Sequence, residues 1–304
     1  MNKLSHISYI YIGVIIMSNL ILNILPVGLR EFMNAINLEG LEEIRLRAGR
    51  QVILDFGKKN GQFVTDYIVT SGQIMEALEY ISTFSLYAYE DDIRQGFITI
   101  KGGHRVGIAG KVVLENGRIK TISHISSINI RVSRQVIGCG DDVMRFIIDN
   151  ENIHNTLIIS PPGVGKTTIL RDILRLISDE LKLKVSIVDE RSEIASCYKG
   201  IPGNDVGIRT DIYDCCPKVE GIMLMIRAMS PQVLAVDEIG GKEDLDALAR
   251  AVHAGIRLVA TVHGQGIDDI QEGLRIFKRY ICLENHVAAG RSIRVYDENF
   301  MPLL

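Results

Sequence analysis

A glycine-rich loop with the chemistry of phosphate binding lies near the middle of the chain, in TLIISPPGVGKTTIL, residues 156–170. An apolar run typical of a buried strand precedes the loop, and a helical pattern follows it. Glycines let a backbone turn its N–H groups toward phosphate oxygens, a lysine can reach the β- and γ-phosphates, and the next hydroxyl can bind Mg²⁺. The residues expected to bind ATP in this way, with Thr167 also a metal ligand and Lys166 also catalytic, are Pro162, Gly163, Val164, Gly165, Lys166, Thr167 and Thr168.

The loop departs at one position from the usual pattern G-x-x-x-x-G-K-[ST], because Ser160 replaces the first glycine. Serine is small and stands where the strand is expected to end, so we expect the bend to tolerate it. The alternative is a glycine-rich turn with a surface lysine. The strand before the loop, the helix after it and the G-K-T-T core favour nucleotide binding.

Acids and a histidine at the ends of three other apolar runs supply what hydrolysis needs. VLAVDEIG ends in Asp237, an expected Mg²⁺ ligand, and Glu238, the expected base that polarises the attacking water. VSIVDERSE ends in Asp189 and continues to Glu193, and we expect both to position metal or water. LVATVHG ends at His263, which can donate a hydrogen bond to phosphate or to water.

The carboxyl ends of parallel strands meet at one edge of a sheet, where ligands bind. We therefore expect Lys166, Asp189, Asp237 and His263 to share one crevice, with the Asp189 strand next to the strand of the loop. Taken alone, each acid pair fits a solvated loop or a helix cap as well as it fits a metal site, and His263 alone favours a structural histidine. Their joint occurrence at strand ends favours a Mg²⁺–nucleotide site.

The elements around these residues indicate two domains. From about residue 136, short apolar runs alternate with helical patterns, which is typical of a mostly parallel sheet. Residues 17–135 carry short strand patterns and one helical pattern over residues 71–89, with Ser71 as the expected N-cap. We predict an α/β fold, with a RecA-like P-loop ATPase core at 136–304 and a smaller α+β N-terminal domain at 17–135.

Residues 1–16 form an apolar extension whose status the sequence leaves open. Residues 4–29 contain no Lys, Arg, Asp or Glu, and ISYIYIGVIIMSNLILNIL approaches the roughly 20 apolar residues that span a bilayer. Serines and asparagines interrupt the run, and no signal-peptide cleavage pattern follows it. Two interpretations stand: a segment that contacts a membrane, or an extension that precedes a translation start at Met17.

Composition limits the class of partner and compartment. The chain has 304 residues, a formal net charge of −3, 6% aromatic residues and no Trp, which does not favour a nucleic-acid partner. Its five cysteines are scattered and form no C-x-x-C pair, as expected for reduced thiols in the cytoplasm. We expect a cytoplasmic protein that lies peripherally at a membrane.

Several segments resemble the ATPases of type II and type IV secretion and of type IV pili. LMIRAMSPQVLAVDEIGGKED is similar to their Walker B region, VDERSE to their acidic box, GIRLVATVHG to their histidine box, and SINIRVSR to the arginine-bearing strand before their core. That family usually has glycine where Asp237 stands, so this chain is closer to an ordinary Walker B sequence. A sporulation-specific branch is more similar still, from about residue 20 to the end, in SPPGVGKTT, GGHRVGIAGK, VDERSEIA and CPKVEGIMLMIRAMSPQVLAVDEIGG.

The resemblance implies a Mg²⁺-dependent ATP hydrolase that assembles into a homo-oligomeric ring, a hexamer. It implies membrane channel proteins of the sporulation complex, between mother cell and forespore, as partners. It also implies nucleotide between subunits or between the two domains, with Arg131 as a catalytic contact to phosphate from the N-terminal domain. Arg134 and Arg209 are further candidates, and solvated surface arginine is the alternative for all three.

Two other classes of function stay open at this point. A nucleic-acid-translocating or recombinase-like ATPase on the same core predicts salt-dependent DNA binding. A nucleotide switch that does not hydrolyse predicts no turnover, and Glu238 argues against it. A transporter of the ABC class needs an L-S-G-G-Q-like signature, which the sequence lacks.

Overall fold

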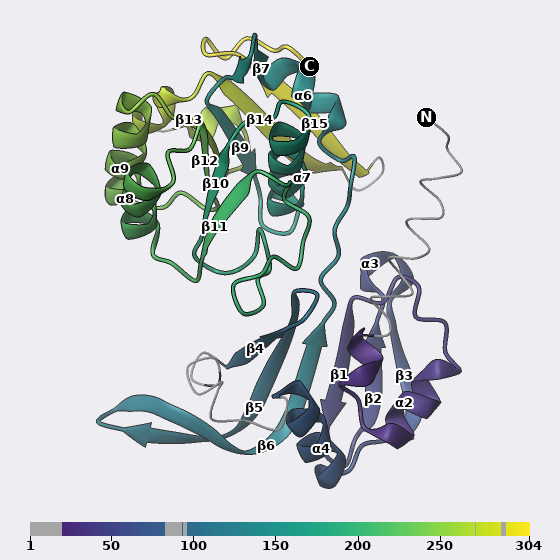
Figure 1. The fold of residues 1–304 in the computed structure, drawn as a ribbon. Helices are drawn as coiled ribbons and strands as arrows, with labels where there is room; N and C mark the ends of the chain where they lie inside the picture. Colours follow the sequence, from purple (N-terminus) through teal and green to yellow (C-terminus); the bar gives the residue numbers. More distant parts are fainter. Residues whose placement is uncertain (1–19, 83–92, 94–95, 271, 287–289) are drawn as a thin grey trace. The chain divides into compact units, whose positions relative to one another are not determined.

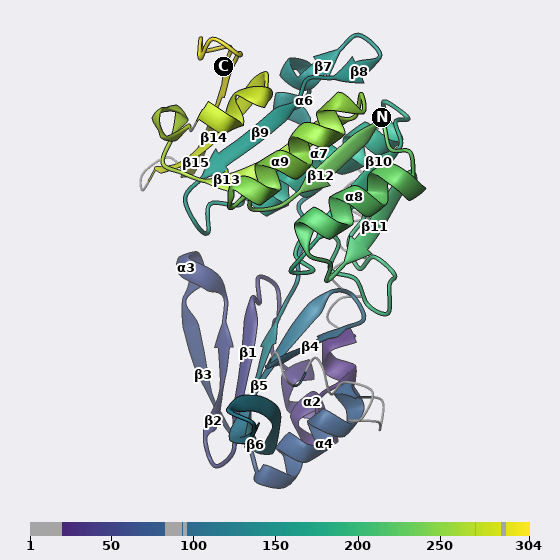
Figure 2. The same cartoon turned by 90° about the vertical axis from the view of Figure 1, so that its left-hand side faces the viewer.

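The computed structural model describes residues 20–82, 93, 96–270, 272–286 and 290–304 (Figures 1 and 2). The chain divides into two compact units: unit 1 holds residues up to Arg134 with Ser196–Tyr198, and unit 2 holds Gln135–Ala195 and Lys199–Leu304. The apolar extension and residues 83–89 of the predicted helix lie outside the described residues. Within the described ranges, every helix is too short or too polar to cross a membrane.

Unit 1 is a six-stranded antiparallel sheet in the order β3-β2-β1-β6-β5-β4. Its buried apolar residues form one core under the two longer helices, which lie on the same side of the sheet (Figure 2). The elements are α2 (Val27–Asn34), β1 (Glu43–Arg47), β2 (Gln51–Asp55), α3 (Gly57–Asn60), β3 (Gln62–Ile68), α4 (Ser71–Ile81), β4 (Phe97–Ile100), β5 (His104–Glu115) and β6 (Arg118–Arg131).

The alternation of apolar and polar residues explains which face of this sheet is covered. Ile128 and Ile130 of β6 are buried, whereas Arg131 is exposed. On β1, Ile44 and Leu46 are fully buried and their neighbours are only half-buried. Side chains of a strand point alternately to opposite faces, so the apolar set packs on α2 and α4 and the arginines occupy the other face.

Helix α4 is capped by Thr70, so the expectation that Ser71 is the N-cap is wrong. The Thr70 hydroxyl accepts a hydrogen bond from the Gln73 N–H (3.2 Å), and the Gln73 side chain accepts one from the Thr70 N–H (3.0 Å). This reciprocal pair is a capping box, which requires Thr or Ser three residues before Gln or Glu. Of the two neighbouring hydroxyl residues, only Thr70 has that spacing.

Unit 2 confirms the predicted α/β class. Its seven-stranded sheet has the order β11-β10-β12-β13-β9-β14-β15, and every neighbouring pair is parallel except β14 with β15. The elements are α6 (Asp141–Ile147), β7 (Ile148–Asp149), β8 (Asn152–Ile153), β9 (Thr156–Ser160), α7 (Lys166–Asp179), β10 (Val185–Asp189), β11 (Thr210–Asp214), α8 (Lys218–Ala228), β12 (Val233–Val236), α9 (Lys242–His253), β13 (Arg257–His263), the short helices η2 (Ile267–Asp269) and η3 (Glu272–Ile276), β14 (Arg279–His286) and β15 (Gly290–Tyr296).

Helices cover both faces of the unit 2 sheet, with α8 and α9 on one side and α7 on the other (Figure 1). The strands in the middle are consequently buried on both faces, and all residues of β9, β10 and β12 are buried. From the sequence we expected β10 to lie next to β9. This prediction is wrong, because β12 and β13 lie between the two strands. Uniformly apolar strands carry little information about which strand lies next to which.

His104, the first residue of β5, makes the stability of unit 1 depend on pH. It is fully buried, and its Nδ1 accepts a hydrogen bond from the Ser133 N–H (3.0 Å). Burial lowers its pKa from 6.5 to about 4. Because the pKa of His104 is lower in the folded state than in the unfolded state, its neutral form contributes to the free energy of unfolding. This contribution is complete above pH 6.5 and is lost as the pH falls through about 4.

We therefore predict that the wild type loses about 3 kcal/mol more unfolding free energy between pH 7 and pH 4 than the variant His104→Asn does. The Asn side-chain oxygen can accept the same N–H but does not titrate in this range. Urea unfolding at a series of pH values measures the difference. The control is His124→Asn, at an exposed histidine of β6. Parallel pH profiles for wild type and His104→Asn would contradict the prediction.

Candidate active site

The predicted phosphate-binding loop connects β9 to α7. Gly163 and Gly165 have positive φ angles of 75° and 99°, which favour glycine, and a Cβ at Gly163 would meet no atom within 4 Å. Gly165 is the N-cap of α7, a helix of 14 residues whose N-terminus and loop N–H groups suit an anion. Ser160 is buried at the end of β9, and its hydroxyl donates to the Pro161 carbonyl (2.9 Å), so the missing glycine is accommodated.

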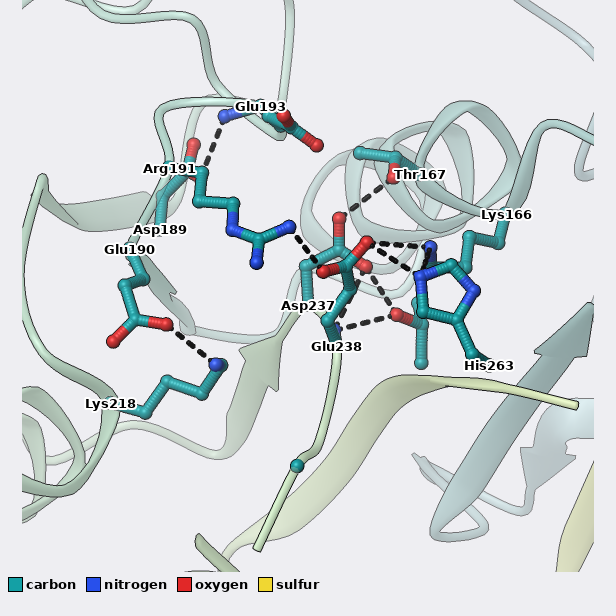
Figure 3. Close-up of polar contacts among 12 residues, drawn as sticks. Lys166, Thr167, Asp189, Glu190, Arg191, Glu193, Lys218, Asp237, Glu238 and His263 are labelled. Carbon is teal, nitrogen blue, oxygen red and sulfur yellow. Dashed lines mark hydrogen bonds and ion pairs between the residues drawn. The ribbon is translucent and has the colours of Figure 1, made fainter. Parts of the chain in front are cut away.

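Three of the predicted side chains meet above the end of β9 (Figure 3). Lys166 Nζ donates to Glu238 Oε1 (2.8 Å) and lies 3.1 Å from His263 Nε2. His263 Nε2 is in turn 3.0 Å from Glu238 Oε1. A lysine ammonium only donates and a carboxylate only accepts. His263 Nε2 therefore either accepts from Lys166 or, when it carries a proton, donates to Glu238. The ammonium group of Lys166 is thus held by a carboxylate in the position from which it can reach phosphate.

A second set of contacts joins the loop to the end of β12. The Thr167 hydroxyl donates to Asp237 Oδ2 (2.7 Å), and Asp237 Oδ1 accepts from the Thr261 hydroxyl and from the Glu238 N–H. Hydroxyl and carboxylate oxygens are the ligand types that Mg²⁺ prefers beside phosphate and water. Thr167 and Asp237 therefore present a donor set that fits Mg²⁺.

Glu238 has an unusual backbone conformation, and positively charged side chains surround its carboxylate. Its φ is +54°, which is uncommon for a residue with a side chain, and its N–H donates to the Thr261 hydroxyl (2.8 Å). Arg191 Nη1 lies 2.5 Å from its second carboxylate oxygen. Burial raises the pKa of Glu238, but the hydrogen bond and charge of Lys166, with the charges of Arg191 and His263, outweigh burial and bring the pKa below 4.5. Glu238 is therefore ionised at neutral pH.

The buried carboxylate of Asp189 organises the turn that follows β10. Its oxygens accept the backbone N–H groups of Glu193 (2.8 Å), Ile194 (2.9 Å) and Ala195 (2.9 Å). Burial raises the pKa of Asp189 to about 6 against the lowering effect of these hydrogen bonds. The geometry favours a structural role for Asp189, and its expected action on metal or water stays a prediction.

Arg171 ties the same turn to the helix of the loop. It is buried on α7, and its guanidinium donates to the carbonyls of Ile194 (2.5 Å) and Glu193 (2.6 Å). Two elements thereby fix the turn, Asp189 from the sheet and Arg171 from α7. The turn forms one wall of a small pocket whose lining residues are Asp189, Glu190, Arg191, Glu193, Lys218, Asp237 and Glu238.

The arginines expected to touch phosphate each have a contact within their own unit. Arg131 is exposed on β6 of unit 1, with its Nε 3.6 Å from Glu43 Oε2. Arg134 of the same unit donates to the Leu41 carbonyl (2.6 Å), and Arg209 of unit 2 donates to the Ser178 carbonyl (3.1 Å). Contact of Arg131 with phosphate stays a prediction.

Sequence reasoning missed three residues of this site: Thr261, Arg191 and Arg171. Thr261 lies two residues before His263 on β13, which pairs with β12, and that neighbourhood follows only from the strand order. Arg191 lies between acidic residues in the turn after β10, and its sequence neighbours do not indicate that it contacts Glu238. Arg171 interrupts the apolar face of a helix. A buried arginine is almost always paired, so this position could have predicted a contact with another segment.

The family model for sporulation stage III, protein AA matches residues 17–303. The chain belongs to this family. The stage III sporulation protein AA of Bacillus subtilis (strain 168) is 41% identical over 299 residues, which cover 92% of this chain and 95% of that protein. Protein SEEDLING PLASTID DEVELOPMENT 1 of Arabidopsis thaliana is 30% identical over 260 residues, 82% of this chain but 34% of that protein.

Solved structures of an ATPase and of a pilus retraction motor share the fold of this family member. The ATPase DotB of Legionella pneumophila superposes with a TM-score of 0.57 at 16% identity, over 88% of this chain and 78% of that one. The pilus retraction motor PilT, solved with bound ADP, superposes with a TM-score of 0.60 at 16% identity, over 88% and 81%. The predicted resemblance to these ATPases is thus confirmed at the level of the fold.

Loss of the Arg171 guanidinium should loosen the turn after β10. We expect Arg171→Met to lower the unfolding free energy by about 1–3 kcal/mol, because the carbonyls of Glu193 and Ile194 each lose a hydrogen bond, although Asn204 still donates to Ile194. Amide hydrogen exchange should speed up at Ile194 and Ala195. The control Arg145→Met removes an exposed arginine of α6 and should change stability by less than about 0.5 kcal/mol. Unchanged exchange at the turn would contradict the prediction and show that the turn does not depend on Arg171.

Proposed function

We propose that this family member is a Mg²⁺-dependent ATP hydrolase built on a RecA-like P-loop core. The observation that carries the proposal is the meeting of Lys166, Thr167, Asp237 and Glu238 at one sheet edge, beside a glycine-bearing loop and a helix N-terminus. These are a phosphate-binding cation, two metal ligands and a carboxylate base within contact distance. Family membership and the shared fold with secretion ATPases support it.

The residues divide the work of hydrolysis between binding and proton transfer. The loop from Pro162 to Gly165, with Thr168 in the first turn of α7, cradles the phosphates, and Lys166 neutralises them. Thr167 and Asp237 would hold Mg²⁺, which would supply charge neutralisation at the phosphate oxygens.

The catalytic base becomes available through the same binding event. When Lys166 moves from Glu238 to phosphate, the carboxylate loses its strongest partner and can accept the proton of the attacking water. Arg191 keeps the second oxygen of Glu238 in place. His263, next to both groups, donates to phosphate or to the water, and Asp189 with Glu193 positions the pocket wall.

We further propose a homo-oligomeric ring, a hexamer, in which Arg131 contacts phosphate when the domains close around ATP. Its partners would be the membrane channel proteins of the sporulation complex, which the ATPase powers or assembles from a cytoplasmic, peripheral position. The support is the family, whose Bacillus subtilis member is a sporulation protein, and the fold that it shares with the pilus motor. The extension at residues 1–16 is either a further contact with the membrane or a segment that precedes a translation start at Met17.

Two substitutions separate binding from chemistry. Lys166→Ala should weaken ATP binding and abolish turnover, because the phosphates lose their cation. Glu238→Gln should keep ATP binding and lower turnover by about 10²–10⁴-fold, the usual contribution of a positioned base. Fluorescent-nucleotide binding and phosphate release measure the two effects, with Glu151→Gln, an exposed residue, as the matched control. Equal turnover by wild type and Glu238→Gln would remove Glu238 as the base.

Arg131 tests the coupling of ATP binding to assembly. Arg131→Ala should retain ATP binding but lose turnover and ATP-dependent assembly, because a contact made only in the closed state biases closure. Sedimentation velocity with a slowly hydrolysed ATP analogue measures assembly. The control Arg50→Ala removes an exposed arginine of the same unit. If Arg131→Ala assembles like wild type, Arg131 is ordinary surface.

A further inference from the structure

A two-stranded ribbon extends from unit 1 beyond the rest of its sheet (Figure 1). Strand β4 pairs with β5 only at residues 104–107, and β1 pairs with β6 only at residues 127–131. Between residues 110 and 126, β5 and β6 therefore have only each other as strand partners among the described strands. A ribbon of two strands is marginally stable alone in water, and such a ribbon usually gains stability by packing on another surface.

One face of this ribbon is aliphatic and exposed. Val112 lies opposite Ile122, and Leu114 lies opposite Ile119. Val112 and Leu114 are two residues apart on β5, and a register shift on β6 between Thr121 and Ile119 keeps their partners on the same face. Ile122 is half-buried and packs against the core of unit 1. The exposed fractions of Val112, Leu114 and Ile119 are 46%, 63% and 45%.

The same ribbon carries a local excess of positive charge. Lys111, Arg118 and Lys120 are exposed on it and Glu115 is its one carboxylate, so the charge from residue 110 to residue 124 is +2 with histidine neutral. Lys120 and Glu115 pair with each other (2.6 Å), which leaves the charges of Lys111 and Arg118 available to a partner. The chain as a whole has a formal net charge of −3, so the ribbon stands out against it.

We propose that the ribbon from residue 110 to residue 126 docks on an anionic lipid surface, with Val112, Leu114 and Ile119 inserted at the boundary of headgroups and acyl chains. Aliphatic side chains flanked by basic ones are typical of elements that lie in a membrane interface. By the same alternation, Lys111 and Arg118 begin on the opposite face of the ribbon. No other described strand pairs with the ribbon along its two edges, so their long stems can extend past these edges and bring their charges to headgroup phosphate.

The area of the face argues against a protein as the occupant. A stable protein interface buries about 800 Å² on each partner. Three exposed aliphatic side chains on a ribbon two strands wide offer much less than this. A lipid surface requires no such area, because each inserted side chain and each basic group adds to binding separately. The proposal specifies which surface makes the proposed peripheral contact, and none of the proposed catalytic residues takes part in it.

The absence of Trp from the chain provides a site-specific test. Leu114→Trp creates a protein with one tryptophan, on the aliphatic face. We expect its emission to shift to shorter wavelength with phosphatidylglycerol vesicles, and brominated lipid to quench it at least twofold more than in the control. The control Ile208→Trp replaces an aliphatic residue of unit 2 that is 81% exposed and should show no shift. Membrane contact through residues 1–16 alone would leave the indole of the Leu114→Trp variant in water, without a shift, and would overturn the proposal.

A charge variant tests the role of the basic residues. Adding Lys111→Glu and Arg118→Glu to Leu114→Trp should raise the lipid concentration needed for half of the shift at least tenfold. No shift with anionic vesicles, or an equal shift with phosphatidylcholine vesicles, would overturn the proposal. A shift that grows with protein concentration without lipid would also overturn it, in favour of a second copy of the chain. Without vesicles, the ribbon variants should hydrolyse ATP at the wild-type rate. Failure of the lipid-docking proposal can therefore be distinguished from failure of the ATPase proposal.

Discussion

The parallel pairing of β9, β13 and β12 is the constraint on which the candidate site depends. His263 lies opposite Ser160 where β13 and β9 end together, and Val236, the last residue of β12, lies opposite Ala260. The three strands come from segments far apart in the chain, but parallel register places their carboxyl ends at one edge. The backbone pairing of these strands maintains that register, and the positions of the loop, the acids and the histidine follow from it.

The contact of Lys166 with Glu238 links the two halves of the proposed mechanism. A nearly buried ammonium group needs a partner, and Glu238 and His263 provide it. Phosphate competes for the same ammonium, so its binding releases the carboxylate that the water needs. Arg191, in the turn after β10, donates a hydrogen bond to the second carboxylate oxygen of Glu238. Hydrogen bonds from Arg171 and to Asp189 stabilise that turn. Substrate binding and activation of the base thereby become one event.

The sequence predicted the meeting of the site residues because each stands at the end of an apolar run, and strand ends of a parallel sheet share an edge. It did not predict the strand order, since uniformly apolar strands have no face that selects a neighbour, and Thr261 was missed for that reason. Thr70 rather than Ser71 caps α4 because the reciprocal bond with Gln73 decides between two hydroxyl groups. Arg191 and Arg171 act through contacts between distant segments, which residue types alone do not reveal.

The central claim is that Lys166 exchanges Glu238 for phosphate when nucleotide binds. A crystal structure of Glu238→Gln with Mg²⁺ and ATP tests it most directly, because slow hydrolysis keeps the nucleotide intact. The account predicts Lys166 Nζ on phosphate oxygens, no longer within hydrogen-bond distance of residue 238 or His263, and Mg²⁺ on the Thr167 hydroxyl. Nucleotide bound away from the loop, with Lys166 still against residue 238 and His263, would contradict it.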